Sequence, residues 1–294
     1  MRQMPSTTGV MFFTDQMPGA ALVDFARRVE TLAYDTLWLP ELFGREVFSS
    51  AGYLLAATER LRIASGIANV YARDALAFRQ AANGLAELSN GRFCLGLGVS
   101  NTGIVAARGQ QWLPPVAKMT AFFDAFDAAI VHAPQASRPA PVYLAAHGPH
   151  LLRLAAQRTD GANTYLMTPE HTCRARGLLG AEQQLNVVQH CMLWPQGSVT
   201  EARSLARRAV GRYVELDYYR RQWSQLGFAD ADFAERGSDS LIDALVAWGD
   251  VDSIAARLQR QRDAGADQVI VVPLNALGGS EPDWALLEAL APAA

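Results

Sequence analysis

Residues 86–101 read AELSNGRFCLGLGVSN, and the order of elements in this segment is typical of an α/β protein. The segment begins as the end of an amphipathic helix, and Gly91 can take the positive φ angle that ends helices. Arg92 to Gly98 is an apolar run of strand length. Ser100 and Asn101 lie in the small polar turn that follows. Because α/β proteins bind ligands beyond the carboxyl ends of their strands, this turn is a candidate site.

The same order, a buried strand and then an amphipathic helix, repeats along the chain and predicts a parallel sheet. The predicted strands cover residues 9–14, 35–39, 61–67, 92–98, 142–146, 160–166, 187–194 and 268–272. The predicted helices cover residues 20–33, 50–59, 75–88, 118–131, 149–157, 200–226, 252–264 and 284–290.

Eight such strands favour a closed (β/α)8 TIM barrel over an open doubly wound sheet. A dinucleotide-binding sheet would place GxGxxG after its first strand. Here Gly96-Leu97-Gly98 lies in the fourth predicted strand, and the third glycine is missing. We therefore expect one TIM-barrel domain over residues 1–294, with a helical insertion at about residues 212–248.

Composition excludes several function classes. The chain has 294 residues, of which 50% are hydrophobic and 19% charged, and its net charge is −3, so a nucleic-acid partner is not expected. No apolar stretch approaches the ~20 residues that cross a bilayer. Three cysteines lie far apart without a CxxC pair, which favours a reducing cytoplasm and argues against a disulfide framework or a metal site.

Several segments together resemble the bacterial luciferase-like flavin-dependent oxidoreductases, and the resemblance runs nearly end to end. Its most specific segment is SNGRFCLGLG at residues 89–98. A tract at residues 237–249 resembles a subgroup presumed to use the deazaflavin coenzyme F-420. The other matching segments are YDTLWLPE at 34–41, ATERLR at 57–62, GIAN at 66–69 and AGADQ at 264–268.

The resemblance implies a coenzyme in the barrel mouth, F-420 or alternatively FMN. Gly66-Ile67 matches the position where the family carries a non-prolyl cis peptide behind the coenzyme ring, with Ala68 and Asn69 following; otherwise Gly66 only ends a strand. Gly96 and Gly98 leave room for the ring or ribityl chain, although Gly96 is as readily explained by packing. Ser100 and Asn101 are candidate donors to the ribityl or phosphate, or simple turn caps.

The coenzyme phosphate needs exposed N–H groups, which a helix N-terminus supplies. Ala146, His147 and Gly148 open the fifth predicted helix and match the family's phosphate-binding position. The His147 side chain is either an additional phosphate donor or incidental to binding.

The candidate catalytic residues are Glu41, Asp15 and Asn101, because each follows a predicted strand and can face the mouth. Glu41 is either an acid–base group or a structural carboxylate that pairs with Arg45 or Arg73. Related deazaflavin enzymes often carry histidine directly after this acid, whereas this chain has Leu42. The imidazole proton donor of those relatives is therefore missing.

The reaction that we expect is hydride transfer between F-420 and a small organic substrate. One alternative is an FMN-dependent monooxygenase that uses reduced flavin and O2. Another is a non-catalytic flavin-binding protein. The resemblance also implies a homodimer.

Overall fold

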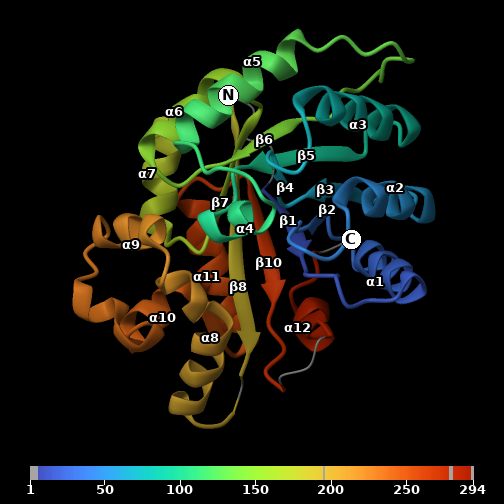
Figure 1. Cartoon of the computed structure of the whole chain (residues 1–294). Helices are drawn as coiled ribbons and strands as arrows, with labels where there is room; N and C mark the ends of the chain where they lie inside the picture. Colours follow the sequence, from blue (N-terminus) through green and yellow to red (C-terminus); the bar gives the residue numbers. More distant parts are fainter. Residues whose placement is uncertain (1–5, 195, 278–280, 293–294) are drawn as a thin grey trace.

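The computed structural model describes residues 6–194, 196–277 and 281–292. Its centre is a sheet of ten strands, of which β4 and β9 are short additions and eight form a closed wall (Figure 1). The wall closes because β10 pairs in parallel with β1 on one side and with β8 on the other. The predicted (β/α)8 TIM barrel is therefore confirmed.

The strands are β1 Thr7–Met11, β2 Thr36–Leu39, β3 Arg62–Ser65, β4 Ala68–Asn69, β5 Phe93–Gly98, β6 Val142–Ala145, β7 Gly161–Tyr165, β8 Gln184–Leu193, β9 Val246–Gly249 and β10 Gln268–Pro273. The helices are α1 Gly19–Thr31, α2 Val47–Ala57, α3 Ala75–Leu88, α4 Thr102–Ala107, α5 Pro115–Ala128, α6 Pro149–Arg158, α7 Pro169–Leu179, α8 Val199–Val214, α9 Asp217–Ser224, the 3-10 helix η1 Asp230–Arg236, α10 Asp239–Leu245, α11 Val251–Asp263 and α12 Trp284–Ala289.

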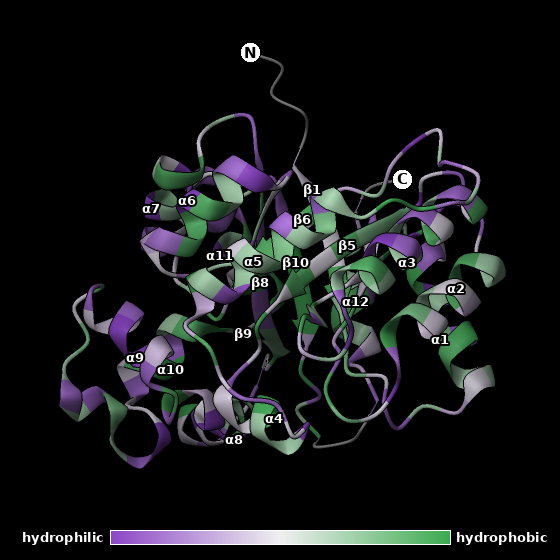
Figure 2. Ribbon diagram, turned by 45° about the horizontal axis from the view of Figure 1, so that its top comes forward, coloured by the Kyte–Doolittle hydropathy of each residue, from purple (hydrophilic) through white to green (hydrophobic). Residues whose placement is uncertain are grey.

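Helices surround the outer face of the wall (Figure 2), and buried side chains pack inside it, so the wall strands are covered on both faces. β10, for example, is buried at every position. Inside the barrel, Met11, Trp38 and Tyr143 belong to one packed cluster. The indole nitrogen of Trp38 donates to the side-chain oxygen of Gln268 at 2.9 Å, so this buried N–H is satisfied across the lumen.

The segment between β8 and α11 differs from the sequence prediction. The helix expected over residues 200–226 is two helices, because Leu216 is extended and separates α8 from α9. This break lets Tyr219 and Trp223 of α9 turn into a cluster with Val210 of α8, where they are buried. α8 begins at Val199, one residue before the predicted helix start, and Val246–Gly249, which overlaps the end of the helical insertion expected at about residues 212–248, is a strand.

α8, α9 and α10 gather beside the carboxyl ends of β8 and β10 (Figure 1). They share a hydrophobic cluster that is separate from the main core, and this cluster includes Leu241, Ile242 and Phe233. One edge of the barrel mouth is thus built by these extra elements.

The organisation of residues 1–294 as one domain stays a prediction. Among the described residues, no helix is both long and apolar enough to span a membrane.

Candidate functional site

The wall between β3 and β5 carries an interruption at the barrel mouth. The peptide bond between Gly66 and Ile67 is cis, which confirms the prediction for this bond. The chain then forms the two-residue strand β4, whose Asn69 lies opposite Gly98 of β5. We call residues 66–69 the bulge. It places Ile67, Ala68 and Asn69 beside the glycine-containing end of β5.

The two glycines of β5 have different surroundings. A Cβ atom on Gly96 would collide with the carbonyl oxygen of Ser65, so this glycine is required by packing inside the wall. A Cβ atom on Gly98 would lie 3.0 Å from the Cβ of Ala145 and 3.4 Å from the Cδ1 of Ile67. Because Gly98 has no side chain, space remains between the bulge and β6; we call the surface at Gly98 the floor of the site.

Asn69 has one side-chain donor that is not used. Its Oδ1 accepts a hydrogen bond from the backbone nitrogen of Tyr71 at 2.9 Å. Its Nδ2 is buried and has no hydrogen-bond partner among the described residues. A buried amide donor without an acceptor is costly, so this group is suited to a ligand oxygen or nitrogen.

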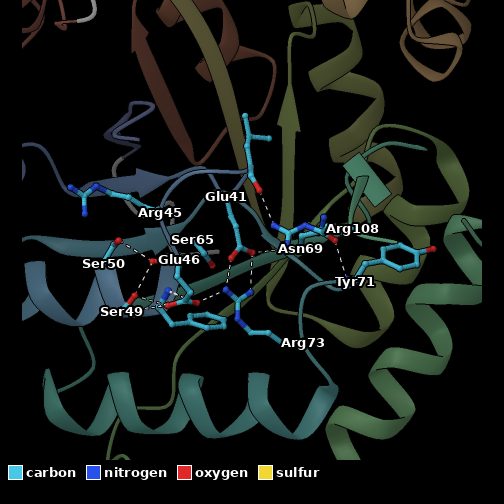
Figure 3. A network of polar contacts seen from close by, with 12 residues as sticks. Glu41, Arg45, Glu46, Ser49, Ser50, Ser65, Asn69, Tyr71, Arg73 and Arg108 are labelled. Atoms are coloured by element: carbon cyan, nitrogen blue, oxygen red, sulfur yellow. Dashed lines mark hydrogen bonds and ion pairs between the residues drawn. The ribbon is translucent and has the colours of Figure 1, made fainter. Parts of the chain in front are cut away.

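Glu41, at the end of β2, is buried and fully engaged (Figure 3). Its Oε2 accepts from the backbone nitrogen of Asn69 and from Nη1 of Arg73, each at 2.9 Å. Its Oε1 pairs with Nη2 of Arg73, and the same guanidinium also pairs with Glu46. Of the two arginines left open by the sequence, Arg73 is the partner. The carboxylate therefore holds the bulge in place.

Asp15 and Asn101 also have structural partners. Oδ1 of Asp15 accepts from the backbone nitrogen of Arg45 at 2.9 Å, and its side chain packs where a Cβ on Gly44 would lie. Oδ1 of Asn101 accepts from the backbone nitrogen of Ile104 at 3.0 Å and so caps α4. Turn capping, one of the two roles considered for Asn101, is thus observed. The catalytic roles of Glu41, Asp15 and Asn101 stay predictions.

The turn between β5 and α4 presents Ser100 at the mouth. Ser100 has a φ angle of +62°, which is uncommon for a residue with a side chain, and it is half-buried. It directly precedes the cap residue Asn101. Its role in coenzyme binding stays a prediction.

The predicted phosphate position also lies at the mouth. α6 begins at Pro149, with Gly148 as its N-cap residue and no side-chain cap, so the first backbone N–H groups are open to an anion. Ala146, just before it, is buried. α9 approaches this end: the ring of Tyr218 stacks on that of His147 with centroids 6.3 Å apart.

His147 itself does not present a cation there. Its Nε2 accepts a hydrogen bond from the backbone nitrogen of Tyr165 at 3.1 Å, so the ring proton of the neutral form lies on Nδ1. Burial, and then the neighbouring His171, lower the pKa of His147 to about 3. The ring is therefore neutral at pH 7 and joins the α6 loop to β7.

A cavity of about 370 Å³ opens beside β8, β10 and the end of β1. Tyr165 at the end of β7 and His190 in β8 line it, together with Arg212 and Tyr213 of α8. The Tyr165 hydroxyl lies 3.1 Å from Nε2 of His190 and 3.0 Å from the Tyr213 hydroxyl. These groups form a polar chain on one wall of the cavity.

Burial determines the protonation states of His190 and Tyr165 in this hydrogen-bonded group. Desolvation, reinforced by the cation of Arg212, lowers the pKa of His190 to about 3, so its imidazole is neutral at pH 7. Desolvation also raises the pKa of Tyr165 well above its usual value, so its hydroxyl keeps its proton. The hydrogen-bonded side chains of Tyr165 and His190 therefore carry exchangeable protons while both remain uncharged.

The sequence prediction missed this cluster. Tyr165 lies at the carboxyl end of a predicted strand, as Glu41 does, so its position was a usable signal. His190 lies inside a long buried strand, where hydrophobic periodicity gives no indication of a partner. Tyr213 lies inside the helix predicted over residues 200–226, whose pattern gave no indication of its partners. Among the described residues, no group of three or more His, Cys, Asp or Glu could hold a metal ion.

Comparison with known proteins relates the chain to one family. Residues 3–268 match the model of the family described as luciferase-like monooxygenase. A 5,10-methylenetetrahydromethanopterin reductase of Methanolobus tindarius is 23% identical over 90% of this chain and 93% of its own length.

Two solved structures share the fold at low identity. A coenzyme F-420-dependent tetrahydromethanopterin reductase from Methanopyrus kandleri is 15% identical with a TM-score of 0.72, over 98% of both chains. An F-420-dependent secondary alcohol dehydrogenase in complex with an F-420–acetone adduct is 15% identical with a TM-score of 0.76, over 98% of this chain and 97% of the other.

Proposed function

The chain belongs to the luciferase-like monooxygenase family and is an enzyme; from that premise we propose that it transfers hydride between coenzyme F-420 and a small organic substrate. The names of the structural relatives support F-420 as the coenzyme. When bound, a deazaflavin supplies the hydride chemistry at its C5 atom, while the protein holds the ring and positions the substrate.

The observation that carries the proposal is the unused Nδ2 of Asn69 next to Gly98. The buried Nδ2 of Asn69 has no protein acceptor, and a Cβ atom on the neighbouring Gly98 would narrow the space between the bulge and β6. The residues present therefore fit a flat ring that carries polar atoms. In this proposal Gly66, Ile67, Ala68 and Asn69 support the ring. Gly98 and Ser100 border the ribityl chain, and Ala146, His147 and Gly148 surround the phosphate.

The three residues predicted to be catalytic take supporting positions at the mouth in this proposal. Glu41 fixes the bulge through Asn69 and Arg73. Asp15 fixes the loop at Arg45, and Asn101 fixes the start of α4.

The direct test is titration of the purified chain with F-420 and with FMN, followed by the fluorescence of each coenzyme. We expect F-420 to bind at least tenfold more tightly than FMN. Replacing Asn69 by Asp keeps the shape and the Oδ1 acceptor but removes the donor, so F-420 affinity should fall about tenfold. Unchanged affinity in N69D would remove the main support for this placement of the ring.

A second candidate function is an FMN-dependent monooxygenase, which the family's description as monooxygenases favours. A deazaflavin activates oxygen poorly. Oxygen uptake that depends on reduced FMN, measured with an oxygen electrode, would therefore replace the F-420 proposal by this one. A non-catalytic coenzyme-binding protein would bind F-420 or FMN but show no turnover with either coenzyme.

The homodimer implied by the family resemblance and the cytoplasmic location favoured by the cysteine spacing are part of the same proposal. The mass of the purified chain in solution, from light scattering behind size-exclusion chromatography, tests the dimer. Cell fractionation tests the location.

A further inference from the structure

The cavity beside β8 and β10 borders the same lumen as the bulge. Met11, which packs in the lumen, has its Cε 2.8 Å from the place where a Cβ on Gly66 would lie. Tyr165 packs against that lumen cluster and also lines the cavity. Phe12 and Phe13, which follow Met11, line the cavity as well. The lumen cluster thus connects the bulge, through Met11, with the cavity wall at Tyr165.

Hydrogen bonds in the cavity wall converge on the Tyr165 hydroxyl. Nη2 of Arg212 donates to the Tyr213 hydroxyl at 3.0 Å, which leaves the Tyr213 proton for the oxygen of Tyr165. Neutral His190 with its ring proton on Nε2 donates to the same Tyr165 oxygen, which leaves the Tyr165 proton free to point into the cavity. In this tautomer Nδ1 of His190, which is buried and has no partner among the described residues, carries no proton and is not an unpaired donor.

The acid–base candidates from the sequence do not offer a free proton. Both oxygens of Glu41 are taken by Arg73 and the Asn69 nitrogen. Asp15 and Asn101 hold backbone nitrogens. Leu42, which follows Glu41, has no ionisable side chain. Among these mouth residues, the Tyr165 hydroxyl is a protonated group that lines a cavity and has a second hydroxyl behind it.

We propose, resting on the proposed function, that the Tyr165 hydroxyl is the proton donor to the substrate, and that the cavity takes a compound whose hydride-accepting carbon is doubly bonded to oxygen or nitrogen. A bound reduced deazaflavin would supply the hydride for the new C–H bond at this carbon, and the electron pair of the substrate's π bond would move to the oxygen or nitrogen. That atom takes the Tyr165 proton, and the O–H electron pair stays on the phenolate.

Tyr213 and Arg212 restore the proton. The Tyr213 proton passes to the Tyr165 oxygen over the 3.0 Å contact, and Tyr213 then takes a proton from water. The guanidinium of Arg212, bonded to the Tyr213 oxygen and exposed on its outer side, stabilises the negative charge during this exchange. His190 acts as a positioning residue because its Nε2 orients the Tyr165 hydroxyl.

The test uses Tyr165→Phe, which removes one oxygen and keeps the ring. Benzamide is the binding probe because its carbonyl accepts a hydrogen bond and is not reduced. We expect the Kd of benzamide, measured by calorimetry, to rise about tenfold in Y165F while the Kd of F-420 stays within twofold. For benzaldehyde with reduced F-420, kcat should fall at least 100-fold and KM should change less than tenfold.

Tyr53→Phe is the matched control, because Tyr53 is 52% exposed on α2. It should leave benzamide affinity and turnover as in the wild type. If Y165F does not fold, as judged by circular dichroism, Tyr213→Phe takes its place; it should keep benzamide affinity and lower kcat about tenfold.

Equal benzamide affinity in wild type and Y165F would overturn the assignment of Tyr165. Absence of benzamide binding to the wild type would overturn the substrate class. Failure of the wild type to bind F-420 is a separate result: it contradicts the proposed function, whereas the benzamide comparison still tests Tyr165.

Discussion

Glu41 accepts a hydrogen bond at 2.9 Å from the backbone nitrogen of Asn69, and this bond ties the end of β2 to the bulge after β3. Arg73 holds the same carboxylate through both of its terminal nitrogens. The bulge in turn places the unused amide of Asn69 beside Gly98. A buried carboxylate thus positions coenzyme-binding candidates without itself having a free oxygen.

Replacing Glu41 by Ala should lower the free energy of unfolding by about 3 kcal/mol, because it leaves the Arg73 cation and the Asn69 N–H without their buried partner. Urea denaturation at pH 7 measures the loss. The control is Glu288→Ala, which removes an exposed pair with Arg28 and should cost less than about 1 kcal/mol. Equal losses in the two variants would show that the Glu41 carboxylate has no special structural role.

Gly98→Ala and Gly96→Ala should separate coenzyme binding from folding. G98A narrows the floor beside Ile67, so F-420 affinity should fall at least tenfold with little change in stability. G96A meets the Ser65 carbonyl inside the wall and should destabilise the fold by about 1–3 kcal/mol. Gly84→Ala in α3, with open space around it, should stabilise by about 0.5–1 kcal/mol. Full F-420 affinity in G98A would contradict the floor.

Buried His190 should make stability depend on pH. Its pKa is about 3 in the folded chain against 6.5 for the free side chain, so between these values the unfolded chain binds more protons. The free energy of unfolding therefore falls as pH falls through this window, by up to about 1.4 kcal/mol per pH unit. In the His190→Gln variant we expect the free energy of unfolding to fall less steeply between pH 6 and pH 4, because the contribution of His190 is missing. Identical slopes in urea titrations would mean that His190 is accessible to protons when folded.

The three cysteines should differ in reactivity. Cys94 and Cys191 are buried, and desolvation raises the pKa of Cys94 to about 11 and that of Cys191 still further, whereas Cys173 is exposed. Iodoacetamide at pH 7.5 should therefore alkylate Cys173 alone in the native chain and all three in urea. Peptide mass spectrometry identifies the sites, and native labelling of Cys94 would show that the barrel lumen opens.

Much of the fold could be predicted because its signals are local. The apolar runs and amphipathic spacings in the first half of the chain place its wall strands and covering helices to within a few residues. The extra elements could not be predicted in this way. Residues 199–249 bury their apolar groups against one another, as Tyr219 and Trp223 do, so local periodicity did not separate α8 from α9 or reveal β9.

The site was predictable where it depends on backbone pattern. The cis bond at Gly66-Ile67 and the helix start at Gly148 are found where the family resemblance implied. Side-chain partners were less predictable. Glu41 had two arginines within reach along the sequence, and only the closed barrel selects Arg73.

The sequence by itself therefore determined the barrel, its family and the strand ends that form the mouth, because these follow from periodicity and short motifs. Only the tertiary structure decided which groups at the mouth are free to act. Tyr165, His190 and Tyr213 come from β7, β8 and α8 and meet only when the wall closes and α8 folds over its edge. Their hydrogen bonds depend on distances across the mouth, which no local pattern encodes.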